Sequence, residues 1–149
     1  MTRAMPSPGR CVLAGFMAGL AAAALANLTA LVLRQRLNLS FDQLNWYLLT
    51  RVTVVLSVLA GFLYFGLLRW TSRPALWFSV IGLAVAAAHS AVNIIHPPEA
   101  GFARIASPID FVVTLTFLVL IPALVPAIPE ANKSVMRESP TPPPLPKQT

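Results

Sequence analysis

The chain has 149 residues, of which 56% are hydrophobic and 11% are charged, and its formal net charge at pH 7 is +6. This length and composition suit one small domain and leave no room for a separate soluble catalytic domain. The 11 Lys and Arg residues are scattered rather than gathered with aromatic residues into a patch, which excludes nucleic acid as the expected partner. The single cysteine, Cys11, excludes an intramolecular disulfide, a CxxC redox pair and a multi-cysteine metal site.

Residues 1–10 form a short N-terminal segment, and an apolar run follows over residues 11–33. Arg3 and Arg10 before this run would also suit a cleavable signal peptide, whose small-residue cleavage site would lie at residues 24–26. We favour a retained helix, because the run continues beyond that site and reaches a full membrane-spanning length.

Three further apolar runs follow, at residues 52–68, 76–95 and 109–128. The four runs hold 17 to 23 residues each, and a helix needs about 20 mainly apolar residues to cross a hydrocarbon core about 30 Å thick. They contain no Lys, Arg or Glu, and Asp110 is their only acidic residue. The sequence therefore predicts an all-α fold, a four-helix transmembrane bundle over residues 11–128, with the lipid bilayer as its partner.

Two helix starts carry capping signals. Ser40 and Gln43 form a capping box, which predicts that the second helix begins near Phe41. Pro108, with a serine before it and Asp110 after it, predicts that the fourth helix begins at about this proline. Asp110 is thereby expected at the membrane interface, as part of the helix cap.

Residues 129–149 are rich in Pro, Ser, Lys and Thr and are predicted to form a disordered tail. Lys and Arg favour cytoplasmic loops, and four spans place both termini on one side. The termini and the second loop carry seven of these residues, whereas the first and third loops carry four. Both termini are therefore predicted to be cytoplasmic, in a multi-pass protein of a bacterial plasma membrane.

The first and third helices carry small residues at four-residue spacing, among them Gly15 and Gly19 in the first and Gly82 in the third. Small residues let helix backbones approach closely. We favour packing within the bundle, and a homodimer or a larger membrane complex stays open as an alternative, because the same spacing serves either purpose.

Polar residues inside the spans are the candidate site, because their burial in hydrocarbon is costly and they usually find partners. Asn27 and His89 each lie six residues before the outer end of their helix, about 9 Å inside at 1.5 Å per residue. Asn93 and His96 share one helix face with His89. The candidate set is Asn27, Ser57, His89, Asn93, His96 and Thr114, with Thr116 as an alternative to Thr114.

Two interpretations of this set stay open. The residues could line an outward-facing polar pocket, or Asn27 and His89 could form interhelical hydrogen bonds that each contribute about 0.6 kcal/mol on average. The structural interpretation is favoured, because the sequence offers no second titratable group at the depth of His89. The lack of a membrane-buried carboxylate also argues against proton-coupled transport.

No cofactor or metal is expected. His89 and His96 lie about 10.5 Å apart along one helix axis, so they cannot ligate opposite faces of one haem iron, although a single axial ligand or a site shared across a dimer stays open. Ser90 follows His89, but adjacent helix positions point about 100° apart and do not pair a nucleophile with its base. No catalytic residue is predicted, and the chain is expected not to be an enzyme.

Four short motifs lie between residues 10 and 128. They are Asn27-Leu28 late in the first helix, Arg69 with Ser72-Arg73-Pro74 in the second loop, Trp77-Phe78 in the third helix and Ile121-Pro122 in the fourth. Together they resemble a family of small bacterial four-helix membrane proteins of unknown function. The last helix of that family often carries a histidine near its start, where this chain has Asp110-Phe111-Val112. The resemblance implies the fold and the membrane location and transfers no catalytic residue.

The first functional prediction is a non-enzymatic membrane protein that acts as an accessory or assembly component. The alternative is a small transporter or binding protein for an apolar or weakly basic ligand, which would use an outer-leaflet pocket around Asn27, His89 and Asn93.

Overall fold

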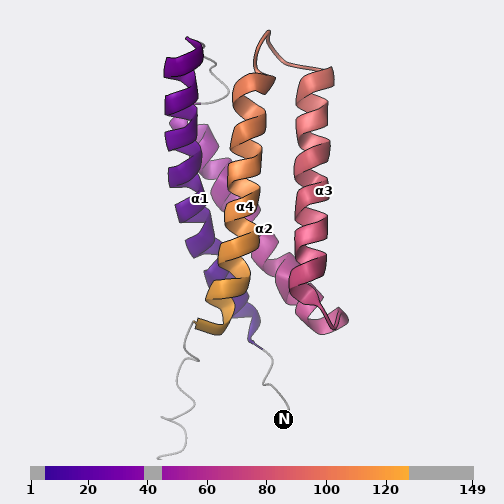
Figure 1. Ribbon diagram of the computed structural model, residues 1–149. Helices are drawn as coiled ribbons and strands as arrows, with labels where there is room; N and C mark the ends of the chain where they lie inside the picture. The colour runs from indigo at the N-terminus through magenta and orange to yellow at the C-terminus, as the bar shows by residue number, and fades with distance from the viewer. Residues whose placement is uncertain (1–5, 39–44, 128–149) are drawn as a thin grey trace, which may run out of the picture.

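The computed structural model of the protein describes residues 6–38 and 45–127. In these two stretches the chain forms four α-helices and no strand. The helices are α1 (Pro8–Leu37), α2 (Trp46–Trp70), α3 (Pro74–Ile95) and α4 (Ala103–Ala127). All four are long and apolar enough to cross a membrane, so the predicted all-α four-helix fold is confirmed (Figure 1).

Three predicted features fall wholly or partly outside the described residues. They are the N-terminal segment up to residue 5, the capping box of Ser40 and Gln43, and the tail at 129–149. Within the described part, α2 begins at Trp46 and Asn45 is its N-cap. The Asn45 side-chain oxygen accepts a hydrogen bond of 2.8 Å from the Leu48 backbone N–H, which satisfies one of the donors left free at a helix start.

α1 separates its large and small side chains onto opposite faces. Large apolar side chains such as Phe16, Leu20 and Leu28 are exposed. The buried residues are all small: Cys11, Ala14, Gly15, Ala18, Gly19, Ala22, Ala23, Ala26 and Ala30. In water the large side chains would gain most from burial, whereas lipid solvates them and leaves the small face free for close helix packing. The arrangement of α1 therefore fits a helix surrounded by lipid.

α1 packs along both α2 and α4, whereas α3 packs mainly on α4 (Figure 1). α2 is inclined relative to its neighbours: it contacts α1 from Thr50 to Gly61 and approaches α3 at its C-terminal end (Figure 1). There the rings of Tyr64 and Phe78 meet edge to face, with centroids 5.2 Å apart. α2 and α3 are thus close at one end and diverge towards the other.

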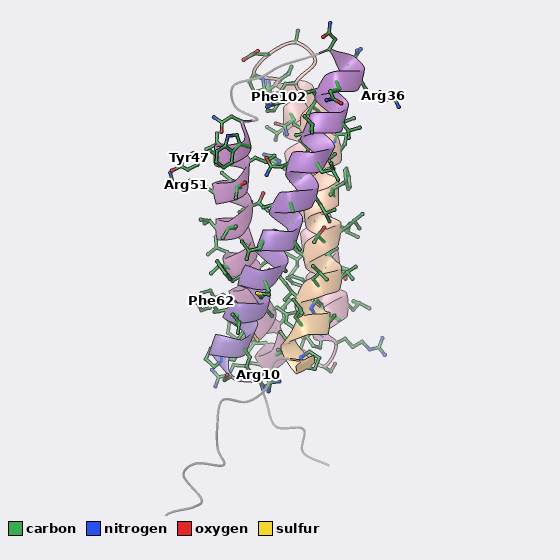
Figure 2. All side chains as sticks on the ribbon, turned by 90° about the vertical axis from the view of Figure 1, so that its left-hand side faces the viewer. Arg10, Arg36, Tyr47, Arg51, Phe62 and Phe102 are labelled. Carbon is green, nitrogen blue, oxygen red and sulfur yellow. The ribbon has the colours of Figure 1, made fainter. Side chains whose placement is uncertain are left out.

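The two ends of the bundle carry different contacts, and we refer to them by residues labelled in Figure 2. The Arg10 end holds the start of α1, the end of α4 and the α2–α3 turn, and the Phe102 end holds the end of α1, the start of α2 and the α3–α4 loop. At the Arg10 end, the Arg10 guanidinium donates to the Pro126 carbonyl at 3.2 Å and ties α1 to α4. At the Phe102 end, Arg51 donates to the Tyr47 hydroxyl at 3.1 Å.

α4 begins at Ala103, so the predicted start at Pro108 is wrong. Gly101 has a φ of 83°, a conformation that favours glycine, and the turn at this residue lets the helix begin earlier. The backbone N–H of Arg104 then bonds the Gly101 carbonyl at 3.0 Å, and that of Ala106 bonds the Phe102 carbonyl at 3.0 Å. Pro108 lies inside the helix, where its missing N–H removes one backbone hydrogen bond.

The earlier start moves Asp110 away from the helix end. Asp110 lies seven residues after Ala103, which corresponds to about 10 Å along the axis. The expectation that Asp110 belongs to the helix cap is therefore wrong. Asp110 belongs to the third turn of a membrane-spanning helix.

Candidate functional site

The predicted polar residues separate into two groups, on opposite sides of the bundle. In the first group, Asn27 of α1 donates from its side-chain amide to the Thr50 hydroxyl of α2 at 3.0 Å and to the Ala23 carbonyl at 2.8 Å. Ser57 of α2 is fully buried against α1, and its hydroxyl donates to the Val54 carbonyl at 2.7 Å. Both residues belong to the contact between α1 and α2, where they act as structural polar groups.

This α1–α2 contact, the seam, leaves no space for a methyl group at its glycines. A Cβ atom added to Gly15 would lie 2.5 Å from the Ser57 carbonyl oxygen and 3.3 Å from Gly61 Cα. A Cβ atom at Gly61 would collide with the Cys11 carbonyl oxygen, and one at Gly19 would collide with the Ser57 hydroxyl. The glycines predicted to allow close approach are therefore used within the bundle.

The second polar group joins α3 to α4. His89 Nδ1 lies 2.8 Å from Asp110 Oδ2. The Asn93 side-chain amide donates to the same carboxylate oxygen at 3.4 Å. With the carboxylate ionised, Nδ1 of His89 is the donor, which leaves Nε2 as the acceptor of a neutral imidazole. The His89 side chain is 61% exposed and that of Asp110 is 22% exposed, so the imidazole is the more accessible partner.

The expectation that His89 has no titratable partner at its depth is wrong. His89 lies six residues before the end of α3, about 9 Å from it, and Asp110 lies about 10 Å from the start of α4. Two antiparallel neighbours place these residues level with each other. Asp110 is a carboxylate within a helix that is long and apolar enough to cross a membrane, so the expected lack of such a group no longer speaks against proton-coupled transport. The sequence feature that indicates this position of Asp110 is Gly101, because a glycine turn there lets α4 begin at Ala103.

A groove of about 620 Å³ lies between α2 and α3, with α4 as its third wall. Most of its lining is apolar, including Leu56 and Leu63 from α2, Val85 from α3 and Phe117 from α4. Its polar lining residues are Thr53, His89, Asp110 and Thr114. The volume falls within the range of about 300–1,000 Å³ that is usual for small-molecule sites.

The polar groups are not distributed evenly along the groove. His89 and Asp110 lie towards the Phe102 end, where α2 and α3 diverge, and the Tyr64–Phe78 contact lies near the Arg10 end. The groove therefore offers a long apolar wall with one polar end. This arrangement suits a ligand that has an apolar body and a polar or charged head.

The remaining predicted site residues lie elsewhere or contribute indirectly. Asn93 contacts Asp110 and positions its carboxylate from outside the groove lining. His96 is the exposed C-cap residue of α3. The Thr116 hydroxyl donates to the Val112 carbonyl of its own helix at 2.7 Å, so Thr114, which lines the groove, is the better of the two threonine candidates.

Sequence reasoning missed Asp110 and Thr53 as site residues. Asp110 was assigned to a helix cap, and Thr53 stands near the predicted start of a span, where a hydroxyl carries no signal of its own. Among the residues that the structure describes, no three His, Cys, Asp or Glu side chains come together as a metal site.

No family model matches the chain, and no curated protein and no solved structure matches it. The resemblance to small bacterial four-helix membrane proteins therefore stays a prediction.

Proposed function

We propose that this multi-pass membrane protein binds, and in its cell carries, a small amphipathic ligand in the groove between α2 and α3. The observation that supports this function most directly is the groove itself, an apolar space of about 620 Å³ with a histidine and an aspartate at one end. The apolar body of the ligand lies against the α2 and α3 walls, and its head lies at His89 and Asp110.

Two physical arguments favour a weakly basic head. A carboxylate and a neutral imidazole together carry one negative charge, which attracts a cation in a low-dielectric surrounding more strongly than it would in water. Nε2 of His89 is also a hydrogen-bond acceptor, so an ammonium head could donate to it. The groove opens laterally between two helices that lipid surrounds, so an apolar ligand can enter from the bilayer.

Blocking the groove tests this function. Val85 and Val119 are exposed to nearly the same extent, 64% and 65%, but only Val85 lines the groove. Purified protein in lipid nanodiscs is titrated with N-phenyl-1-naphthylamine, an uncharged apolar fluorophore, and protein-free nanodiscs give the background. We expect saturable binding that Val85→Trp weakens at least fivefold and that Val119→Trp leaves unchanged. Absence of saturable binding, or equal affinities of the two variants, would contradict the proposal.

The accessory or assembly role is the second candidate, and the exposure of α3 favours it. α3 rests mainly on α4, and large side chains such as Val92 and Ile94 are more than half exposed. A transmembrane helix of a partner, or a second copy of the chain, could cover this surface. Native co-purification from membranes with mass spectrometry tests this role, and recovery of a stoichiometric partner that Val92→Trp displaces would support it over ligand binding.

We also propose the bacterial plasma membrane as the location, with both termini cytoplasmic and no enzymatic activity. The excess of Lys and Arg in the termini and the second loop supports this orientation. Labelling of single cysteines in sealed cells tests it in a Cys11→Ala background. A cysteine at Ser72 should be protected from an impermeant reagent, and one at Ala100 should react. The reverse pattern would invert the orientation.

A further inference from the structure

We propose that His89 and Asp110 form an exchange site at which a proton and a lipophilic cation displace each other. This inference rests on the proposed function and adds to it the charge of the ligand and the ion that competes with it. The hydrogen bond between His89 Nδ1 and Asp110 Oδ2 at 2.8 Å and the position of both residues on the groove lining carry the argument.

The pair has two charge states that differ by one proton. With a carboxylate at Asp110 and a neutral imidazole at His89, the pair carries a charge of −1. When Nε2 of His89 takes up a proton, the imidazolium and the carboxylate sum to zero. In both states the carboxylate accepts the hydrogen bond from Nδ1, and the exchanged proton lies on Nε2.

A cationic head can neutralise the first state but has nothing to neutralise in the second. Binding of a cation to the protonated pair therefore releases one proton from Nε2 of His89 to the solvent, and the total charge is conserved. A wholly apolar ligand makes no such demand on the pair. The pair at one end of the groove therefore selects a ligand by the charge of its head, and the apolar walls select it by the shape of its body.

The described residues that line the groove add no other titratable group to the exchange. From α2 the groove is lined by apolar residues and Thr53, from α3 by His89 as the single titratable residue, and from α4 by Asp110 as the single one. Asn93 donates to Asp110 and is uncharged in either state. The other titratable residues that the structure describes near this end of the bundle lie off the groove lining: Arg34, Arg36, Tyr47, Arg51, His96, Glu99 and Arg104.

Both partners are accessible enough to exchange ions. Asp110 and His89 lie about 9–10 Å from the helix ends at the Phe102 end of the bundle, and their side chains are 22% and 61% exposed. A proton can reach the pair from that end, while a lipophilic cation enters along the groove.

The test uses the whole protein in nanodiscs and tetraphenylphosphonium, a permanently charged lipophilic cation with no proton of its own. Binding is measured between pH 5 and 8, the range in which imidazoles change charge, and proton release is followed in weakly buffered solution with a pH indicator. We expect the apparent Kd to rise towards tenfold per pH unit on the acidic side of this range. We also expect release of up to one proton for each cation bound there.

Two variants separate the roles of the pair. Asp110→Asn should weaken tetraphenylphosphonium binding at least tenfold and abolish proton release. His89→Gln should make cation binding independent of pH over this range and abolish proton release, because Asp110 is then the single charged group of the pair. Elution of each variant at the wild-type volume in size-exclusion chromatography shows that it is folded.

The outcomes distinguish the two levels of the proposal. If tetraphenylphosphonium binds in the groove with a pH-independent Kd and without proton release, the exchange site is overturned and the binding function stands. If neither probe binds saturably, both are overturned. Proton release that survives His89→Gln would place the exchanged proton elsewhere and would also overturn the assignment.

Discussion

The seam between α1 and α2 and the groove between α2 and α3 show how one helix can have two unlike neighbours. Along the seam, backbones approach so closely that Gly15 and Gly61 have no room for a Cβ atom. Across the groove, α2 and α3 meet at the Tyr64–Phe78 ring contact and then diverge to leave about 620 Å³. α2 therefore packs tightly against α1 along the seam and diverges from α3 across the groove.

The comparison teaches that the small residues of α1 hold α2 in a way that α3 does not. Without a hydrophobic driving force in lipid, close packing and interhelical hydrogen bonds hold helices together. The seam supplies both, through its glycines and through the bond from Asn27 to Thr50. The groove lacks this close backbone contact, and its polar pair is 61% exposed at His89 and 22% exposed at Asp110.

The largest expected effect is the loss of the seam. Gly61→Ala should lower the free energy of unfolding by about 1–3 kcal/mol, the usual range for overpacking, because the new methyl group meets the Cys11 carbonyl. The measurement is thermal or denaturant unfolding in detergent. The ligand affinity should fall as well, because a displaced α2 alters the groove.

Gly66→Ala is the matched control on the same helix. Its Cβ atom would meet the Trp70 ring at 3.7 Å, which is an ordinary contact. Alanine also has a higher helix propensity than glycine by roughly 0.8–1.0 kcal/mol, so this variant should be at least as stable as the original chain. If Gly61→Ala and Gly66→Ala shifted unfolding equally, the seam would not be the tighter region.

Sequence reasoning predicted the seam better than the groove, for a physical reason. The four apolar runs predict four spans, and the small residues at Gly15 and Gly19 mark a face where helices can approach. Both signals are local and periodic. The groove depends on where α2 crosses its neighbours, and no residue of α2 taken alone reports that inclination.

The candidate site shows the same limit. Asn27, His89 and Asn93 were identified because polar residues in apolar runs stand out, and each of them does bond across a helix interface. Asp110 was missed as a site residue because its position depends on where α4 begins. After the turn at Gly101 the helix starts five residues before Pro108. Asp110 therefore lies in the third turn of α4, level with His89.

The next effect concerns the point where α2 and α3 meet. Phe78→Leu removes the edge-to-face contact with Tyr64, and we expect it to destabilise the protein by about 1 kcal/mol, since such ring pairs contribute about 0.5–1.5 kcal/mol. Phe62→Leu is the control, because Phe62 lies on the outward side of α2 and is 52% exposed (Figure 2). Equal unfolding midpoints for the two variants would show that the ring contact does not hold the closed end of the groove.

A smaller effect should come from the polar bond of the seam. A double-mutant cycle with Asn27→Ala and Thr50→Val measures the coupling between the two side chains, which lie 3.0 Å apart. We expect a coupling energy of about 0.6 kcal/mol, the average for interhelical hydrogen bonds in membranes. A coupling energy near zero would leave glycine packing as the single cause of the seam's stability.

The smallest effect on stability is expected at His89, although its effect on cation exchange should be large. His89→Ala removes a side chain that is 61% exposed, and Asn93 still donates to Asp110, so the free energy of unfolding should fall by less than about 0.6 kcal/mol. Unfolding and tetraphenylphosphonium binding are measured on the same preparation. A protein that stays folded but loses proton release fits a binding pair, whereas a protein that fails to fold would make His89 a structural contact like Asn27. The Asn27–Thr50 and His89–Asp110 contacts would then both be structural, and the groove would have no binding pair.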